Sequence, residues 1–109
     1  MKSNIKFLNE VAKFSKTSSK SNDMFSSDQM KVDILTMKAG QYFSPTQSYL
    51  ADSYYYVLEG EAIFEIDDDV SILVPNASLF VGPGQSVGII NESDENLIIL
   101  KVQAPPEGI

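Results

Sequence analysis

The sequence predicts an all-β protein built as an antiparallel sandwich or barrel. Short apolar segments follow one another, separated by turns rich in Gly, Pro, Asn and Asp. No helical segments lie between these strands, which excludes an α/β fold with helical crossovers. The 109 residues, 43% of them hydrophobic and 21% charged, suit one globular core with no room for a second.

The N-terminal part of the chain has a different pattern from the rest. Asn4–Phe14 begins with strand-like alternation at Ile5 and Phe7 and continues with apolar residues at helical spacing. It predicts a short strand that runs into a helical turn. Ser15–Asn22 is a run of Ser, Thr and Lys without periodicity, and it predicts a flexible loop.

Beyond this region the chain is a succession of predicted strands. We therefore expect residues 1–22 to form an N-terminal strand, or arm, with a flexible loop, and residues 23–109 to form a single barrel domain. Acidic and apolar residues alternate in the segment after Gly60, as in a strand with one buried face. The predicted strands are Met24–Ser26, Met30–Met37, Tyr54–Leu58, Glu61–Ile66, Val70–Val74, Leu79–Val81, Ser86–Ile90 and Leu97–Val102.

Three residue types are missing from the chain: Cys, His and Arg. Without Cys there is no disulfide, cysteine–zinc site or thiolate nucleophile. Without His the chain lacks the commonest metal ligand and the usual general base. Without Arg it cannot capture a phosphate or carboxylate in a bidentate fork. Catalytic Ser-His-Asp and Cys-His arrangements are excluded.

The net charge of −7 is unevenly distributed. Residues 39–109 contain a single lysine, Lys101, and 11 acidic residues. Because such a surface repels phosphate backbones, we expect no binding to nucleic acid. Neither a secretion signal nor a membrane span is visible, so we expect a cytoplasmic protein with no membrane partner.

The positions of the turns match two spaced motifs. Gly40 and Gly60 fit the two ends of the first, and Gly84 and Asn91 fit the inner glycine and the last residue of the second. In this spacing the chain resembles the cupin family over roughly residues 30–102. The resemblance implies a cupin-type antiparallel double-stranded β-barrel (jelly roll) and a homodimer that exchanges N-terminal strands, here through Ile5 and Phe7.

The family's four metal-ligand positions fall on residues that are poor ligands. Thr46, Ser48 and Ser53 stand where the family has His, His and Glu, and Val87 stands at the remaining His position. Neutral hydroxyls bind transition metals weakly, and valine does not bind them at all. We therefore expect no metal and no cofactor.

Strand alternation predicts which side chains face the interior of the barrel. The expected ligand-binding residues are Thr46, Ser48, Ser53, Tyr55 and Val87, with Tyr42 and Phe80 as neighbours. These side chains either fill the barrel or surround a cavity for a small uncharged polar ligand such as a sugar or polyol. No catalytic residue is identified.

Three functional hypotheses remain open from the sequence. The first is a metal-free binding or regulatory protein for a small molecule. The second is a metal-independent isomerase, epimerase or lyase acting on a small sugar or acid. The third is a structural subunit whose outward-facing tyrosines, Tyr54 and Tyr56, contact a partner protein.

Overall fold

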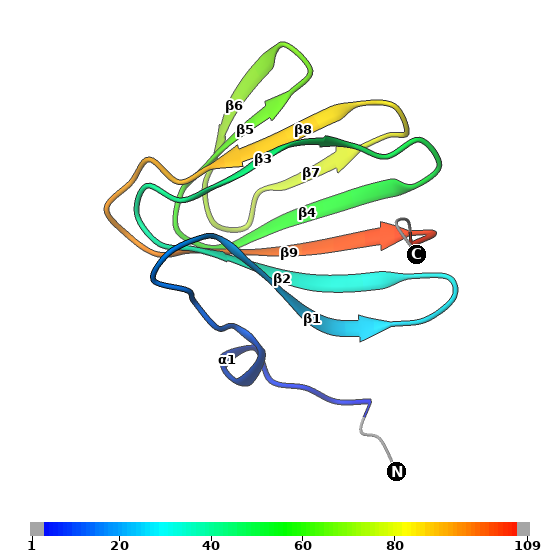
Figure 1. Cartoon of the computed structure of the whole chain (residues 1–109), viewed down its shortest axis with the longest axis horizontal. Helices are drawn as coiled ribbons and strands as arrows, with labels where there is room; N and C mark the ends of the chain where they lie inside the picture. Colours follow the sequence, from blue (N-terminus) through cyan, green and yellow to red (C-terminus); the bar gives the residue numbers. More distant parts are fainter. Residues whose placement is uncertain (1–3, 107–109) are drawn as a thin grey trace.

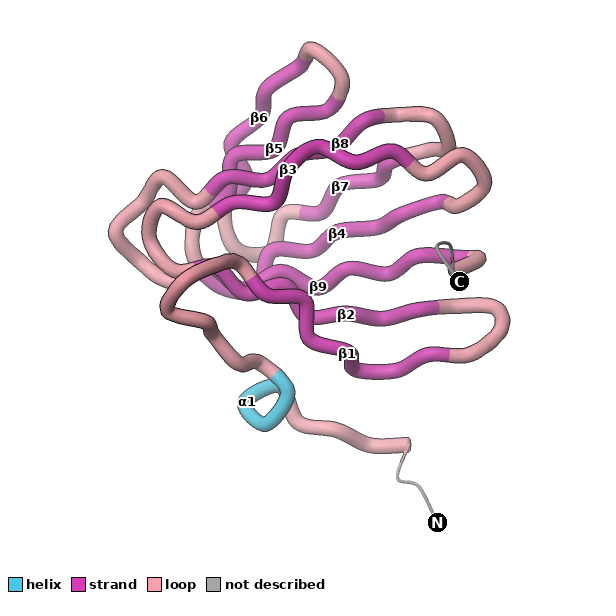
Figure 2. Tube along the Cα trace, in the orientation of Figure 1, coloured by secondary structure: helices cyan, strands magenta, loops and turns pink. Residues whose placement is uncertain are grey.

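The computed structural model describes residues 4–106, which fold into two facing antiparallel β-sheets (Figures 1 and 2). The first sheet has the order β1-β2-β9-β4-β7 and the second the order β3-β8-β5-β6. The strands are β1 (Lys20–Ser26), β2 (Lys31–Met37), β3 (Tyr42–Gln47), β4 (Asp52–Glu59), β5 (Ala62–Ile66), β6 (Asp69–Leu73), β7 (Ser78–Val81), β8 (Ser86–Ile90) and β9 (Leu97–Ala104).

The chain crosses repeatedly between the two sheets, as in a jelly roll. β3 and β4 follow one another in sequence but belong to different sheets, and so do β4 and β5. β9, the last strand in the sequence, lies between β2 and β4 and pairs with both. The all-β prediction and the double-stranded barrel are confirmed.

The inner face of the larger sheet changes in character along its strands. At one end it is apolar: Met37, Val57, Leu97 and Ile99 are fully buried against Phe64 of the opposite sheet. In β4 and β7 buried residues alternate with more exposed ones, as expected for strands with one face toward the core. At the other end the inner face carries polar and charged side chains, and that is where the cavity described below lies.

The N-terminal arm differs in part from the prediction. The helical turn is present as α1 (Leu8–Val11), but Ile5 and Phe7 form no strand and are 73% and 63% exposed. Among residues 4–106 no helix is long and apolar enough to cross a membrane. Exchange of this arm between two copies stays a prediction, which light scattering at micromolar concentration would test.

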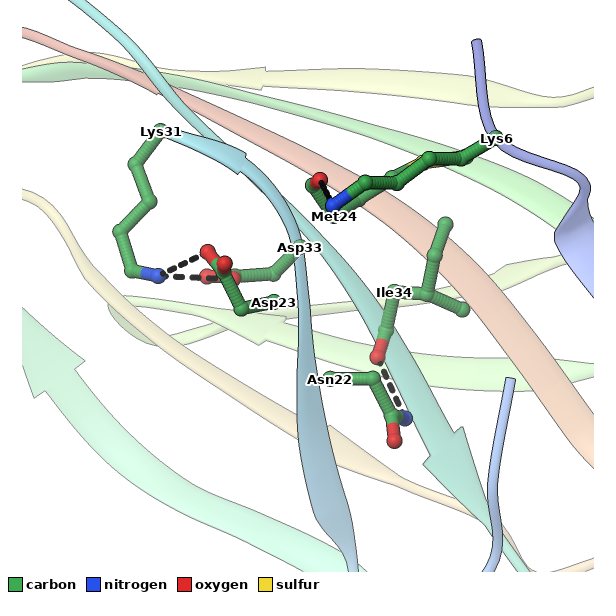
Figure 3. Close-up of polar contacts among 7 residues, drawn as sticks. All are labelled: Lys6, Asn22, Asp23, Met24, Lys31, Asp33 and Ile34. Carbon is green, nitrogen blue, oxygen red and sulfur yellow. Dashed lines mark hydrogen bonds and ion pairs between the residues drawn. The ribbon is translucent and has the colours of Figure 1, made fainter. Parts of the chain in front are cut away.

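The arm is held on the larger sheet by polar contacts of β1. The Asn22 side chain donates hydrogen bonds to the Lys13 carbonyl at 3.2 Å and to the Ile34 carbonyl at 2.9 Å. Lys6 donates to the Met24 carbonyl at 2.6 Å (Figure 3). The Lys6 ammonium also lies 5.2 Å from the centre of the Phe25 ring.

Two strand predictions were wrong in the sequence analysis. β1 begins at Lys20, not at Met24, because the residues expected to form the end of a loop pair with Thr36, Leu35 and Ile34 of β2. β3 was missed altogether, since its sequence contains Pro45 and lacks alternating hydrophobicity. It is an edge strand, where proline is tolerated.

Candidate functional site

A cavity of about 450 Å³ opens at the polar end of the barrel. Its walls come from β2, β4, β7 and β9 of one sheet, from β3 and β8 of the other, and from the turns that follow β3 and β7. It is lined by charged residues (Lys31, Asp33, Lys101), hydroxyls (Thr46, Ser48, Ser53, Tyr55), amides (Gln47, Gln85, Gln103) and small or apolar residues including Ala51, Val81 and Val87.

The floor of the cavity is set by the pairing of β9 with its two neighbours. Lys101 lies between Asp33 of β2 and Tyr55 of β4 in one row across the sheet. Gln103 lies between Lys31 and Ser53 in the next row. Because side chains two residues apart in a strand share a face, both rows face the interior.

The opposite wall is formed by β3 and β8. Thr46 of β3 pairs with Val87 of β8, and both line the cavity. Ser48, in the turn after β3, holds the rim in place, since its hydroxyl accepts a hydrogen bond from the Ala51 amide at 3.0 Å. The structure thus brings Thr46, Ser48, Ser53, Tyr55 and Val87 together around one cavity.

Tyr42 does not face this cavity, and its expected inward orientation was wrong. It is 60% exposed. Between the pairs Phe43–Ile89 and Thr46–Val87, β3 advances three residues while β8 advances two, so β3 contains a bulge. The extra residue reverses the alternation. Phe43, not Tyr42, therefore packs against the core on the same face as Thr46.

Phe80 also points away from the cavity, 61% exposed. It pairs with Tyr54, which lies on the outer face of the sheet, whereas Tyr55 pairs with Leu79 and faces inward. The alternation of β7 therefore places Leu79 and Val81 inside and Phe80 outside. Tyr54 faces outward, as predicted from the sequence. Tyr56 is half-buried and donates a hydrogen bond to the Asn76 side chain at 2.8 Å.

Lys31 is held by two carboxylates at the edge of the cavity (Figure 3). Its Nζ lies 2.9 Å from Asp33 Oδ1 and 3.1 Å from Asp23 Oδ1. These hydrogen bonds, that with Asp33 foremost, raise the pKa of Lys31 above its ordinary value. Lys31 and Asp33 therefore form an ion pair with each other.

Lys101 is one of the charged residues of the cavity lining that were not predicted from the sequence. Its Nζ lies 5.8 Å from the centre of the Tyr55 ring, within the range of a cation–π contact. Burial lowers the pKa of Lys101, and the nearby Asp33 carboxylate opposes that effect. Strand alternation could have predicted its inward orientation, because Lys101 lies two and four residues after the buried Ile99 and Leu97 and so shares their face of the strand.

Tyr55 forms the boundary between the cavity and the apolar core. Its ring packs edge-on against Phe64, with centroids 5.4 Å apart and an interplanar angle of 69°. Burial raises the pKa of Tyr55 to about 12, because the phenolate is poorly solvated there. At neutral pH its hydroxyl is protonated and available as a hydrogen-bond donor.

The raised pKa of Tyr55 gives a pH-dependent contribution to stability. The folded protein keeps this proton between pH 10 and 12 while the unfolded chain loses it, so stability falls as the pH rises through this window. From pH 9 to pH 11 the wild type should lose about 1 kcal/mol more unfolding free energy than Tyr55→Phe. Urea unfolding at both pH values measures this difference, and an equal fall in the two proteins would contradict it.

A second hollow of about 180 Å³ adjoins the cavity between β1 and β3. It shares Thr46, Tyr55, Val87 and Lys101 with the larger one. These four side chains therefore lie between two spaces, and Lys101 is accessible from both.

The donor set does not fit a metal ion. The four positions where the resemblance places ligands do lie around one cavity, but they supply three neutral hydroxyls and a valine. Within residues 4–106 no three carboxylate side chains come together in a group that could hold a metal. The charged residues of the lining, Lys31, Asp33 and Lys101, offer only one carboxylate, and Lys31 occupies it.

The fold and the cavity together define a double-stranded β-barrel with a small-molecule-sized hollow at one end. No family model and no curated protein sequence matches the chain. Solved structures do. The protein TT1209 from Thermus thermophilus superposes with a TM-score of 0.90 at 28% identity, covering 94% of this chain and 98% of that one.

Two further solved structures share this fold. An uncharacterized conserved protein with a double-stranded β-helix domain from Klebsiella pneumoniae has a TM-score of 0.90 at 22% identity, covering 95% of this chain and 91% of that one. A cupin superfamily protein from Desulfitobacterium hafniense has a TM-score of 0.80 at 21% identity, with coverage of 91% and 88%. The chain therefore has the cupin fold, as the spacing of its turns predicted.

Proposed function

We propose that this chain is a metal-free binding protein that holds a small hydroxylated molecule, of the sugar or polyol type, in its barrel. The observation that supports it most is the composition of the cavity wall. Hydroxyl and amide side chains that can donate and accept hydrogen bonds stand beside apolar ones such as Val81 and Val87. The volume of about 450 Å³ lies within the usual range for small-molecule sites, roughly 300–1,000 Å³.

The titration of Tyr55 favours binding over catalysis. A tyrosine with a pKa of about 12 is a hydrogen-bond donor at neutral pH and a poor proton acceptor. The sequence has no His or Cys to act as a base or nucleophile in its place. A metal-independent isomerase or lyase, the second hypothesis, would need a base from the lining, either Lys101, whose pKa is lowered by burial, or the Asp33 carboxylate.

Elemental analysis and a thermal-shift screen of the purified protein test the proposal. We expect less than stoichiometric metal, no rise in melting temperature with divalent metals, and a rise with members of a library of sugars, polyols and sugar acids. Stoichiometric metal would contradict the metal-free assignment. Turnover of a library member by the metal-free protein would favour the isomerase or lyase.

A pair of variants places the ligand in the cavity. Val87→Phe fills the space between Thr46 and the floor, and we expect it to abolish the ligand-dependent shift. Val70→Phe is the matched control, since Val70 is 63% exposed on β6, outside the cavity. An unchanged shift in Val87→Phe, with its folded state verified by circular dichroism, would place the ligand elsewhere.

A further inference from the structure

The charge of Lys101 gives more detail about the ligand, in an argument that rests on the proposed binding function. Lys101 stands on the cavity floor between Asp33 and Tyr55. Lys101 is half-buried, so its ammonium has lost part of its hydration, which is costly for a charge unless an opposite charge or hydrogen bonds offset the loss.

The protein itself supplies little of that compensation. Among residues 4–106, both ion pairs with nitrogen and oxygen within 4.0 Å belong to Lys31, and neither involves Lys101. The row partner with a negative charge, Asp33, already accepts a hydrogen bond at Oδ1 from Lys31 Nζ, 2.9 Å away. The face of the Tyr55 ring, with its centre 5.8 Å from Nζ, is the contact that Lys101 does make.

We infer that the ligand carries a carboxylate group, which pairs with the Lys101 ammonium while the surrounding hydroxyls and amides bind its hydroxyl groups. The ligand class is thus a small hydroxylated monocarboxylate. A carboxylate placed at Nζ would gain a charge-assisted hydrogen bond in a partly desolvated site, where such bonds are strong. Ser53, Gln103 and Thr46 lie on the walls around that point.

A single negative charge fits better than a phosphate. The chain has no Arg for bidentate binding of a phosphate. Within the described part of the lining, Lys101 is the one cation that is not already paired with a carboxylate. The net charge of −7 also opposes the approach of multiply charged anions.

The test compares two probes that differ only at one carbon. D-gluconate and D-glucitol have the same six-carbon chain and the same hydroxyls on the other carbons, and neither has a carbonyl that could form an imine with a lysine. Isothermal titration calorimetry of the full chain at pH 7.5 should show at least tenfold tighter binding of gluconate. Equal affinities for the two probes would overturn the inference and leave the proposed binding function standing, whereas binding of neither would count against both.

Two lysine variants test whether the preference for gluconate over glucitol depends on Lys101. Lys101→Met keeps the length of the side chain without its charge, and it should remove the tenfold preference while retaining the affinity for glucitol. Lys20→Met removes the same charge from an exposed site on β1 outside the cavity, and it should leave the preference intact. A preference that survives in Lys101→Met would overturn the inference.

The wild type alone provides a second readout if Lys101→Met does not fold. Because burial lowers the pKa of Lys101, the gluconate preference should fall as the pH is raised from 7.5 to 10.5, while glucitol affinity changes little. The charged and titratable groups facing Lys101 are Asp33 and Lys31 of β2, Asp23 of β1 and Tyr55 of β4. A preference that is constant over this range would contradict pairing with Lys101.

Discussion

Gly60→Ala should lower the free energy of unfolding by about 3 kcal/mol, a large share of the roughly 5–15 kcal/mol typical of a domain. A Cβ at this position would lie 2.3 Å from the Asn96 carbonyl oxygen and 3.0 Å from the Leu97 Cα. Both are backbone atoms where the chain enters β9, so neither can move without disturbing a central strand. The φ of +86° adds strain for any residue with a side chain.

Gly84→Ala separates the two causes. Gly84 has the same φ of +86°, but a Cβ there would meet nothing within 4 Å. This variant should lose about 1 kcal/mol, the cost of the left-handed conformation alone. Urea unfolding at neutral pH measures both variants. Equal losses would show that the close approach of β9 to Gly60 is not what requires glycine there.

Asn91→Ala should also destabilise the fold by about 3 kcal/mol, because it removes the hydrogen-bond partner of the buried Met37 carbonyl and of part-buried groups of Ser93 and Glu95 at once. Asn91 is fully buried. Its amide nitrogen donates to the Met37 carbonyl at 3.2 Å and to the Glu95 carbonyl at 2.8 Å. Its side-chain oxygen accepts from the Ser93 backbone amide at 3.2 Å and the Ser93 hydroxyl at 2.7 Å.

Asn96→Ala is the matched control for Asn91→Ala. The same atoms are removed five residues further along the same turn region, but from an exposed side chain. Its unfolding free energy should stay within about 0.5 kcal/mol of the wild type. A comparable loss in both variants, measured by urea unfolding, would mean that the hydrogen bonds of Asn91 are not the source of its effect.

These two positions explain why the fold could be predicted from the sequence. Gly60 and Asn91 belong to the spaced motifs, and the structure gives each of them a role in backbone geometry that other residues cannot fill. The short strands between turns were predictable for the same reason, since turn residues and alternation act locally. Such constraints depend on the backbone and persist when the chemistry of the site changes.

The cavity was less predictable, because it depends on pairing between distant strands. The bulge in β3 reversed the orientation expected for Tyr42, and only the register of β3 against β8 reveals it. The inward orientation expected for Phe80 was wrong because its pairing with the outward-facing Tyr54 is not visible in the sequence. Lys101 was noticed as an isolated positive charge, but its neighbours Asp33 and Tyr55 come from two other strands.

The change from apolar to polar side chains along the inner face also divides the molecule by its tolerance to mutation. Around Val57, Leu97 and Ile99 a truncation to alanine would leave a void in a tightly packed interior, at a cost of several kcal/mol. Thr46, by contrast, is exposed and lines the cavity, and exchanging its hydroxyl for another polar group of similar size disturbs no packing. A barrel of this design can change the chemistry of its cavity wall without first losing its stability.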